Sequence, residues 1–252
     1  MNKRSLTVGR SVEFAAVLAV GLASIGCDGA SGDGGSGEGA GGCVAVFDGV
    51  DDGLVVEPGG VGLSDEFSLS VFAKPEPLED GGVAFLAGLH VDGGSNGFYL
   101  ALVNEDGTQK ARFIVFPGDS TCAPTAALPE GDGVHVLGSY DGSTARLFLQ
   151  GALAASEPCG APSIDSTASF TIGRSNTNQF PFAGALDDVA YYEYALVEDF
   201  DAGKLECTNA SFRVDFEDVT AMRAPDACGA SDGAALGDPE SPDETQPEIV
   251  CP

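Results

Sequence analysis

Carboxylates are the side chains through which this sequence could do chemistry. It has 39 Asp and Glu against 11 Lys and Arg, a formal charge of −28, and only two His. Paired carboxylates hydrolyse glycosidic bonds only when they face each other across a cleft. Asp215 and Glu217 could share one strand face, but we expect them, like the acids of Glu198–Asp201, to be solvated surface or loop residues. The excess of negative charge also repels phosphate backbones and excludes nucleic acid as a partner.

Calcium binding is the second use that carboxylates can serve, because Ca²⁺ takes six to eight oxygen ligands. Asp48, Asp51 and Asp52 lie in a Gly-containing turn that can also expose backbone carbonyls. The alternative is that these acids only accept backbone N–H bonds within the turn. We therefore keep Ca²⁺ as the one candidate cofactor, with these three acids as its first candidate ligands.

A glycan site would need amides and aromatic rings on loops or on a concave face. The candidates in loop-like positions are Asn96, Phe98, Tyr99, Asn176, Asn178 and Gln179. For Ser175–Asn178 the alternative is a polar turn that binds nothing. Ser-His-Asp catalysis is not indicated, because neither His lies in a recognisable catalytic context: His135 lies within an expected strand, where we expect a packing role.

Short segments of alternating apolar and polar residues must position these side chains. Phe67, Leu69 and Val71 would face one side of a strand, with serines on the other side. Asp141-Gly142 between two such segments indicates a hairpin. The helix-like stretch Leu196–Leu205 is short. The pattern predicts an all-β, two-sheet antiparallel jelly-roll sandwich over residues 43–206, with a short helical turn near 196–205.

The N-terminal residues 1–26 resemble a bacterial lipoprotein signal. A basic start precedes the apolar run Phe14–Ile25, whose 12 residues are too few for a comfortable membrane span. Cys27 would carry the lipid; an ordinary signal peptide cleaved nearby is the alternative. The Gly-rich residues 27–42 would form a flexible tether. We therefore expect an exported protein, lipid-anchored at a bacterial cell envelope, in the periplasm or at the cell surface.

Cysteine numbers agree with export. If Cys27 takes the lipid, six of the seven Cys remain, and an even remainder in an exported chain suggests three disulfides. No two Cys have the C-x-x-C spacing of a zinc or redox site. The spacing alone does not choose among the possible pairings.

Six segments resemble, in the same order, motifs of laminin-G-like domains of the concanavalin A-like lectin/glucanase superfamily. They are Val46–Asp52, Phe67–Pro75, Gly133–Gly142, Leu147–Gly151, Phe170–Arg174 and Phe182–Val189. The resemblance covers roughly residues 43–206 and implies a jelly roll that binds carbohydrate or protein, often with a calcium ion. It also implies that the strand with Asp187 and Asp188 runs near the Asp48 turn, where at most one of these two acids could join a metal site.

Two departures from the family motifs bear on function. Phe72 and Gly133–Val134 stand where the family usually has Trp, which argues against glycan binding that depends on those aromatic rings. Glucanases of the superfamily carry E-x-D-x-x-E on one strand, and this spacing does not occur in the sequence. The chain is therefore predicted not to be an enzyme.

The C-terminal extension, residues 207–252, contains segments that look permuted. Phe212–Glu217 resembles the strand that often precedes the first family motif, and Asp226–Gly237 resembles the loop after it. This order would bring the C-terminal Cys near the first Cys of the domain, so the resemblance implies the pairs Cys43–Cys251, Cys122–Cys159 and Cys207–Cys228. The extension should pack on the sandwich as a strand plus an acidic loop.

The function predicted from the sequence is non-catalytic binding of carbohydrate, or of an envelope or extracellular protein, by a lipid-anchored domain. The alternative is a structural or adhesion module stabilised by calcium, and a glycoside hydrolase ranks third. The membrane would be a partner only through the lipid anchor.

Overall fold

The computed structural model describes residues 42–56, 64–91, 96–164, 168–200, 205, 207, 210–219, 223–229, 233–236 and 246–252. The predicted signal segment 1–26, Cys27 and the tether up to residue 41 lie outside these described residues. A search of the described residues finds no helix that is long and apolar enough to cross a membrane.

Sixteen strands form the regular structure of the described residues. The first eight are β1 (Val44–Asp48), β2 (Leu54–Val56), β3 (Phe67–Pro75), β4 (Val83–Leu89), β5 (Phe98–Glu105), β6 (Thr108–Val115), β7 (Thr125–Ala127) and β8 (Val134–Tyr140). The others are β9 (Thr144–Leu149), β10 (Ala152–Pro158), β11 (Phe170–Ile172), β12 (Ala183–Tyr192), β13 (Ala210–Val214), β14 (Arg223–Ala224), β15 (Ala234–Leu236) and β16 (Glu248–Val250).

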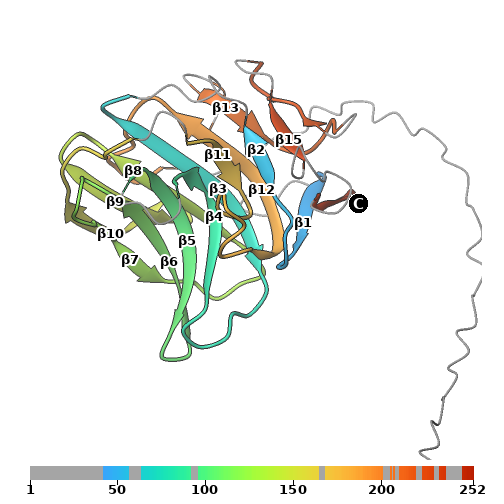
Figure 1. Ribbon diagram of the computed structural model, residues 1–252, viewed down its shortest axis with the longest axis horizontal. Coiled ribbons are helices and arrows are strands. Elements are labelled where there is room, and N and C mark those ends of the chain that lie inside the picture. The colour runs from blue at the N-terminus through green and yellow to red at the C-terminus, as the bar shows by residue number, and fades with distance from the viewer. Residues whose placement is uncertain are drawn as a thin grey trace, which may run out of the picture. The chain divides into compact units, whose positions relative to one another are not determined.

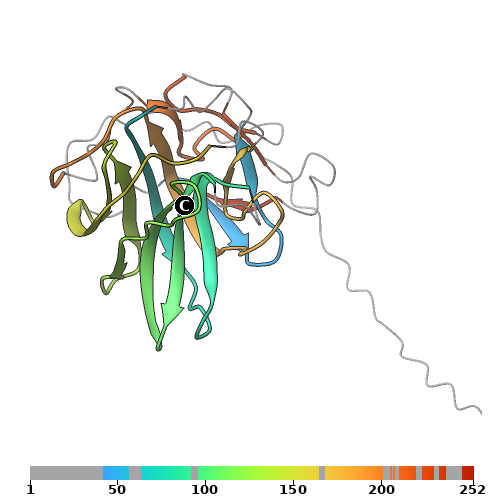
Figure 2. The same cartoon turned by 60° about the vertical axis from the view of Figure 1, so that its left-hand side comes forward.

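These strands form two eight-stranded antiparallel sheets, which are the two layers visible in Figure 1 and, from the side, in Figure 2. Sheet A has the order β10-β9-β8-β3-β12-β1-β16, and β13 also pairs with β12. Sheet B has the order β14-β15-β2-β11-β4-β5-β6-β7. The predicted all-β, two-sheet antiparallel sandwich is confirmed.

Alternation along β3 explains how the sheets bury their inner faces. Phe67, Leu69, Val71 and Ala73 all belong to the core and are at most 1% exposed. The Phe67 ring meets the ring of Phe98, from β5 in sheet B, with centroids 4.1 Å apart. Complete burial of one such side chain stabilises the fold by about 1.5–3 kcal/mol. Contacts of this kind hold the two sheets face to face.

The helical turn predicted near 196–205 is wrong for the residues described there, 196–200 and 205, which contain no helix. The Ser68 hydroxyl of sheet A accepts the N–H of Leu196 at 3.0 Å and donates to the carbonyl of Tyr194 at 2.9 Å. These two bonds fix the chain at the start of the segment against sheet A.

Three disulfides close the chain on itself: Cys43–Cys251, Cys122–Cys159 and Cys207–Cys228. They are the pairs that the family resemblance implied. Disulfides form and persist in oxidising compartments, so these three indicate an extracytoplasmic protein.

The described C-terminal residues belong to the sheets themselves. β13 pairs with residues 189–192 of β12, and β1 pairs with residues 183–186 along the same edge. β15 extends sheet B beside β2, and β16 borders β1 through Val250 and Val44. β13 and β1 therefore follow one another along β12, as expected if the first strand of the family fold had moved to the C-terminus.

Candidate functional site

One end of sheet A carries most of the predicted site residues. Phe47 of β1 lies opposite Gly184 of β12, Gly184 lies opposite Pro75 of β3, and Ala73 of β3 lies opposite Val134 of β8. Four neighbouring strands thus begin or end together, and their turns meet there. We call this region the loop end. It consists of the segments 48–53, 76–82, 106–107, 128–133 and 173–183.

Asp48, Asp51 and Asp52, the acid triad, gather in the turn between β1 and β2. One carboxylate oxygen of each lies within 4.8 Å of the others. The turn is also held by its own acids, since Asp52 Oδ2 accepts the N–H of Asp48 at 2.7 Å and Asp48 Oδ1 accepts the N–H of Val50 at 2.8 Å. The acids thus cap the turn, and their carboxylates also converge.

Burial makes Asp52 the unusual member of the acid triad. Burial, followed by the charges of Asp48 and Asp51, raises the pKa of Asp52 to about 6, although its hydrogen bond from the Asp48 backbone lowers it. An ionised carboxylate in this place is costly unless a cation is near. Ca²⁺ prefers carboxylate and carbonyl oxygens, which this turn supplies. The acid triad could thus hold a metal ion such as Ca²⁺.

Asp187 and Asp188 lie elsewhere on β12. Asp48 is opposite Ala183, four residues before Asp187, and four strand positions span about 13 Å. Asp188 instead accepts a hydrogen bond from Arg213 Nε at 3.1 Å, at an irregularity where the β12–β3 pairing shifts register. The structure therefore brings neither acid to the acid triad, although β12 itself begins beside Asp48, as the family resemblance implied.

Asp215 and Glu217, the pair considered for hydrolysis, follow β13 and lie near Asp187. Burial and the charge of Asp188 raise the pKa of Asp187 to about 7, and Asp215 and Glu217 add to the effect. Glu217 also has a structural use, because its Oε1 accepts the N–H of Cys43 at 3.0 Å. These acids crowd the junction between β13 and β1 rather than a pocket.

The loop Gly173–Ala183 lies against the acid triad at both of its ends. Ala183 is opposite Asp48 in the β1–β12 register. A Cβ atom added at Gly53 would lie 2.3 Å from Nε of Arg174, so the arginine side chain passes directly over that glycine. The loop and the turn that carries the acid triad therefore form one continuous surface.

Three predicted ligand residues, Asn176, Asn178 and Gln179, stand on this loop. The Ser175 hydroxyl accepts the N–H of Gln179 at 2.9 Å, which fixes the polar turn. Asn178 and Gln179 are exposed, and the Phe180 side chain that follows is 42% exposed. The loop therefore presents amides and an aromatic ring to solvent beside the acid triad.

The other three predicted ligand residues, Asn96, Phe98 and Tyr99, are not in the loop end. Phe98 is 1% exposed and belongs to the core, so its predicted ligand role is wrong. Asn96 Oδ1 accepts a backbone N–H at 3.1 Å within the β4–β5 connection. Tyr99 packs against Phe85 with ring centroids 5.1 Å apart. These residues look like part of a loop in the sequence, but β5 begins at Phe98 and most of its residues are buried.

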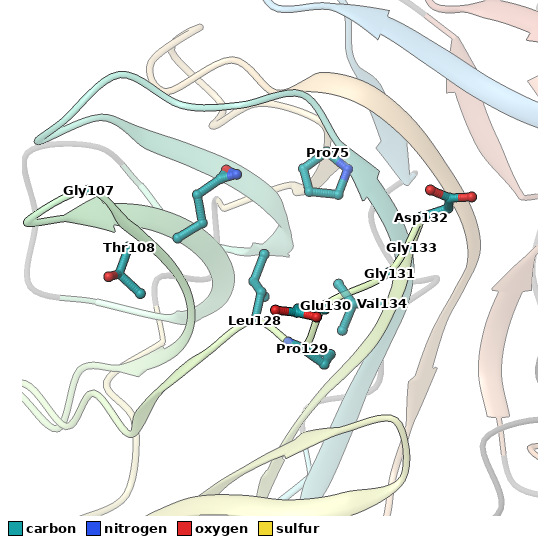
Figure 3. Close-up of a pocket in the computed structure, with 11 residues that line it drawn as sticks. Pro75, Gly107, Thr108, Leu128, Pro129, Glu130, Gly131, Asp132, Gly133 and Val134 are labelled. Atoms are coloured by element: carbon teal, nitrogen blue, oxygen red, sulfur yellow. The ribbon is translucent and has the colours of Figure 1, made fainter.

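An open pocket of about 390 Å³ lies at the loop end, and the sequence analysis did not identify it. It is formed by the end of β3, the β5–β6 turn and the segment before β8, as Figure 3 shows. Its lining residues are Pro75, Gly107, Thr108, Gln109, Leu128, Pro129, Glu130, Gly131, Asp132, Gly133 and Val134. The run Pro129–Gly133 before a strand was the one local signal for such a turn.

The pocket combines apolar and polar groups. Leu128, Val134 and the prolines are its apolar part, and Figure 3 shows Leu128 and Val134 flanking the Glu130 side chain. The Glu130 and Asp132 residues are exposed. Gln109 is fixed in the wall, because its Oε1 accepts the N–H of Leu78 at 3.3 Å. The arrangement can hydrogen-bond a small polar molecule and cover part of its apolar surface.

The pocket lining contains no Ser, Cys or His. His135 lies in sheet A, where its Nε2 and the Ser70 hydroxyl are 2.7 Å apart, and burial lowers its pKa to about 4. The Phe200 ring packs on it at a centroid distance of 5.9 Å. His135 thus has the packing role that its place in a strand indicated.

Comparison with protein families gives one match. A family model described as the concanavalin A-like lectin/glucanases superfamily matches residues 48–199. No curated protein matches the chain in sequence.

Two solved structures show the same fold. A candidate carbohydrate-binding protein from Bacteroides ovatus is 13% identical, with a TM-score of 0.58 over 82% of this chain and 60% of its own. A heptameric SAP-like pentraxin from Limulus polyphemus is 14% identical, with a TM-score of 0.52 over 80% of this chain and 97% of its own. The chain thus spans less than two thirds of the first protein, and at these identities the likeness concerns the fold alone.

Proposed function

The chain belongs to the concanavalin A-like lectin/glucanases superfamily, and from this premise we propose that it is a non-catalytic carbohydrate-binding module with its ligand site at the loop end. The observation that carries the proposal is the pocket of about 390 Å³. Its size falls within the range of about 300–1,000 Å³ that is usual for small-molecule sites. The acid triad and the exposed amides lie at the same end.

The chemistry of the pocket suits a sugar. Sugar hydroxyls need acceptors and donors, and the C–H face of the ring needs an apolar surface. Glu130 and Asp132 offer acceptors, the Gln109 amide offers a donor, and Leu128 and Val134 offer the apolar surface. The lining contains no aromatic residue, so hydrogen bonds would supply most of the selectivity.

We propose that this site binds without cleaving. Glycoside hydrolysis needs a protonated and an ionised carboxyl group on either side of the scissile bond. Asp187, whose pKa burial and nearby charge raise to about 7, would suit the protonated role. It lies about 13 Å along β12 from the loop end, however, and thus away from the pocket.

Calcium is proposed as a stabilising ion at the acid triad. The convergence of three carboxylates and the raised pKa of Asp52 support this assignment. A bound cation would relieve the repulsion among the acids and keep the turn against the loop Gly173–Ala183. It would then organise the surface beside the pocket rather than take part in a reaction.

A protein ligand is the second candidate. Two large apolar side chains are exposed at the same end, Val50 at 64% and Phe180 at 42%. Exposed apolar side chains of this kind favour contact with a protein surface more than with a hydroxyl-rich sugar.

Export with a lipid on Cys27 is proposed from the sequence. The apolar run before Cys27 and the Gly-rich residues after it support an anchor with a spacer. The three disulfides support the oxidising compartment that export would require.

A glycan array with the full chain tests the proposed function. We expect binding to one class of oligosaccharide, and loss of binding by Thr108→Trp, which places a large ring at the pocket mouth. Thr121→Trp is the matched control, because Thr121 is also an exposed threonine but does not line the pocket. Absence of any glycan signal, together with capture of a protein, would favour the second candidate.

A further inference from the structure

The pocket is surrounded by acids. Glu130 and Asp132 are exposed residues of its lining, and Asp80 Oδ1 accepts the N–H of Gly107, another lining residue, at 3.2 Å. None of the lining residues is Lys, Arg or His. The lining therefore offers a ligand two carboxylic residues, with a third acid bonded to the wall behind Gly107, and no cation.

The same charge extends over the loop end. Its five segments contain one basic residue, Arg174, which is 7% exposed. They contain nine acids, namely Asp48, Asp51, Asp52, Glu76, Glu79, Asp80, Asp106, Glu130 and Asp132. An approaching anion is therefore repelled before it reaches the pocket, since charges on one surface add to a common field.

Basic residues on the adjoining strands do not offset these acids. Lys74 precedes Pro75 on β3, and alternation directs successive side chains to opposite faces of the strand. Lys110 of β6 is already paired, with its Nζ 2.8 Å from Glu105 Oε2. Neither cation is placed to receive a negative group inside the pocket.

We propose that the pocket selects sugars without negative charge, and that Glu130 and Asp132 set this specificity. The inference rests on the proposed carbohydrate function and narrows its ligand class to neutral or amino sugars. A carboxylate or sulfate in place of a hydroxyl would lie close to Glu130, which stands between Leu128 and Val134, with Asp132 on the same lining segment and no counter-charge in the lining. Like charges brought together at a binding site lower affinity and suppress wrong partners.

The test uses an array that holds neutral oligosaccharides beside counterparts with the same backbone and an added uronate, sialate or sulfate group. The full chain should bind a neutral or amino sugar at least about tenfold more strongly than its acidic counterpart. Glu130→Gln with Asp132→Asn keeps acceptor oxygens but removes both charges. The affinities of this double variant for the neutral sugar and for its acidic counterpart should differ by no more than about threefold. Asp119→Asn with Asp218→Asn is the matched control, since it removes two exposed acids outside the pocket.

Raising the salt concentration gives a second measurement on the same protein. Added salt screens exposed charges, so the preference for the neutral sugar should shrink in the wild type while binding of the neutral sugar itself stays constant. A thermal melt of both double variants verifies that they are folded.

Three results would overturn the inference. The first is equal or stronger binding of acidic counterparts by the wild type, which would leave the carbohydrate function standing. The second is a preference that Glu130→Gln with Asp132→Asn leaves unchanged. The third is no binding of any glycan, which would remove the proposed function together with the inference.

Discussion

Asp52 Oδ2 accepts the backbone N–H of Asp48 at 2.7 Å, and the Asp48 carboxylate in turn accepts the N–H of Val50. The acids that could bind a cation therefore also shape the turn that holds them. A cation would meet a turn that is already formed, and removal of a single acid can affect the turn, the cation, or both. Experiments on the acid triad have to separate these effects.

Calcium should stabilise the folded protein through the acid triad. A ligand that binds only the folded state adds about 2.7 kcal/mol at a hundred times its dissociation constant. We therefore expect a rise of several degrees in the melting temperature with Ca²⁺ over chelator. Asp51→Asn should abolish the rise, and Asp51 is chosen because Asp48 and Asp52 also hold the turn.

The control for calcium is Asp119→Asn, which removes an exposed acid on a different loop. It should keep the full calcium-dependent rise in melting temperature. An equal rise in Asp51→Asn and in the control would show that the ion binds elsewhere, and no rise in the wild type would remove the calcium proposal.

Metal-free stability should fall with rising pH because of Asp52. Its folded pKa of about 6 lies above its ordinary value of 3.8, so the folded protein holds this proton more tightly than the unfolded chain. The stability that this proton adds is fully present below about pH 4 and is lost as pH rises through about 6. Asp52→Asn should remove this part of the pH dependence.

Urea unfolding in chelator at several pH values between 4 and 7.5 measures the effect. The difference between wild type and Asp52→Asn isolates this carboxylate from Asp187, whose raised pKa of about 7 overlaps the range. Parallel pH profiles for the two proteins would contradict the assignment. With Ca²⁺ present the trend should reverse, because the ion binds the ionised carboxylate.

Two glycines with similar backbone angles should respond very differently to substitution by alanine. Gly173 has φ +82°, and a Cβ atom there would lie 2.1 Å from the Phe47 ring. Gly107 has φ +74° with nothing within 4 Å of such a Cβ. Gly107→Ala should cost about 1 kcal/mol for its backbone conformation, and Gly173→Ala clearly more, because the buried ring must move. Similar urea midpoints for the two variants would be evidence against this packing.

The lipid anchor depends on one side chain. Replacement of Cys27 by Ser removes the thiol that would carry the lipid, so the protein should move from the membrane fraction to the soluble fraction. Cell fractionation followed by detection of the protein measures this. Retention of Cys27→Ser in membranes would contradict the anchor and favour an ordinary signal peptide or another attachment.

Local sequence predicted the fold because most of its determinants are local. Alternation in β3 identifies the inner face from Phe67 to Ala73, and the structure buries these side chains. The helical turn predicted near 196–205 is absent from the residues described there, and Ser68, more than 120 residues away in the chain, accepts the backbone N–H of Leu196. A propensity for helix cannot anticipate such a contact.

The sequence predicted only the part of the candidate site whose residues are close together in the chain. The acid triad lies within five residues, so its convergence could be expected. The pocket joins Pro75, Thr108 and Glu130, which no sequence pattern links before the sheets are paired. Asp187 lies on the strand that borders the acid triad but four residues past the partner of Asp48, a separation that only the β1–β12 register reveals.

The central claim is that a carbohydrate binds in the pocket at the loop end. The most direct test is to record nuclear magnetic resonance spectra of the labelled full chain while adding the strongest glycan from the array. We predict shifts of the Gln109 side-chain amide and of the Gly131 and Gly133 backbone amides, and no such shifts in Thr108→Trp. Shifts that leave these amides unchanged and fall elsewhere, or no shifts at saturating sugar, would contradict the claim.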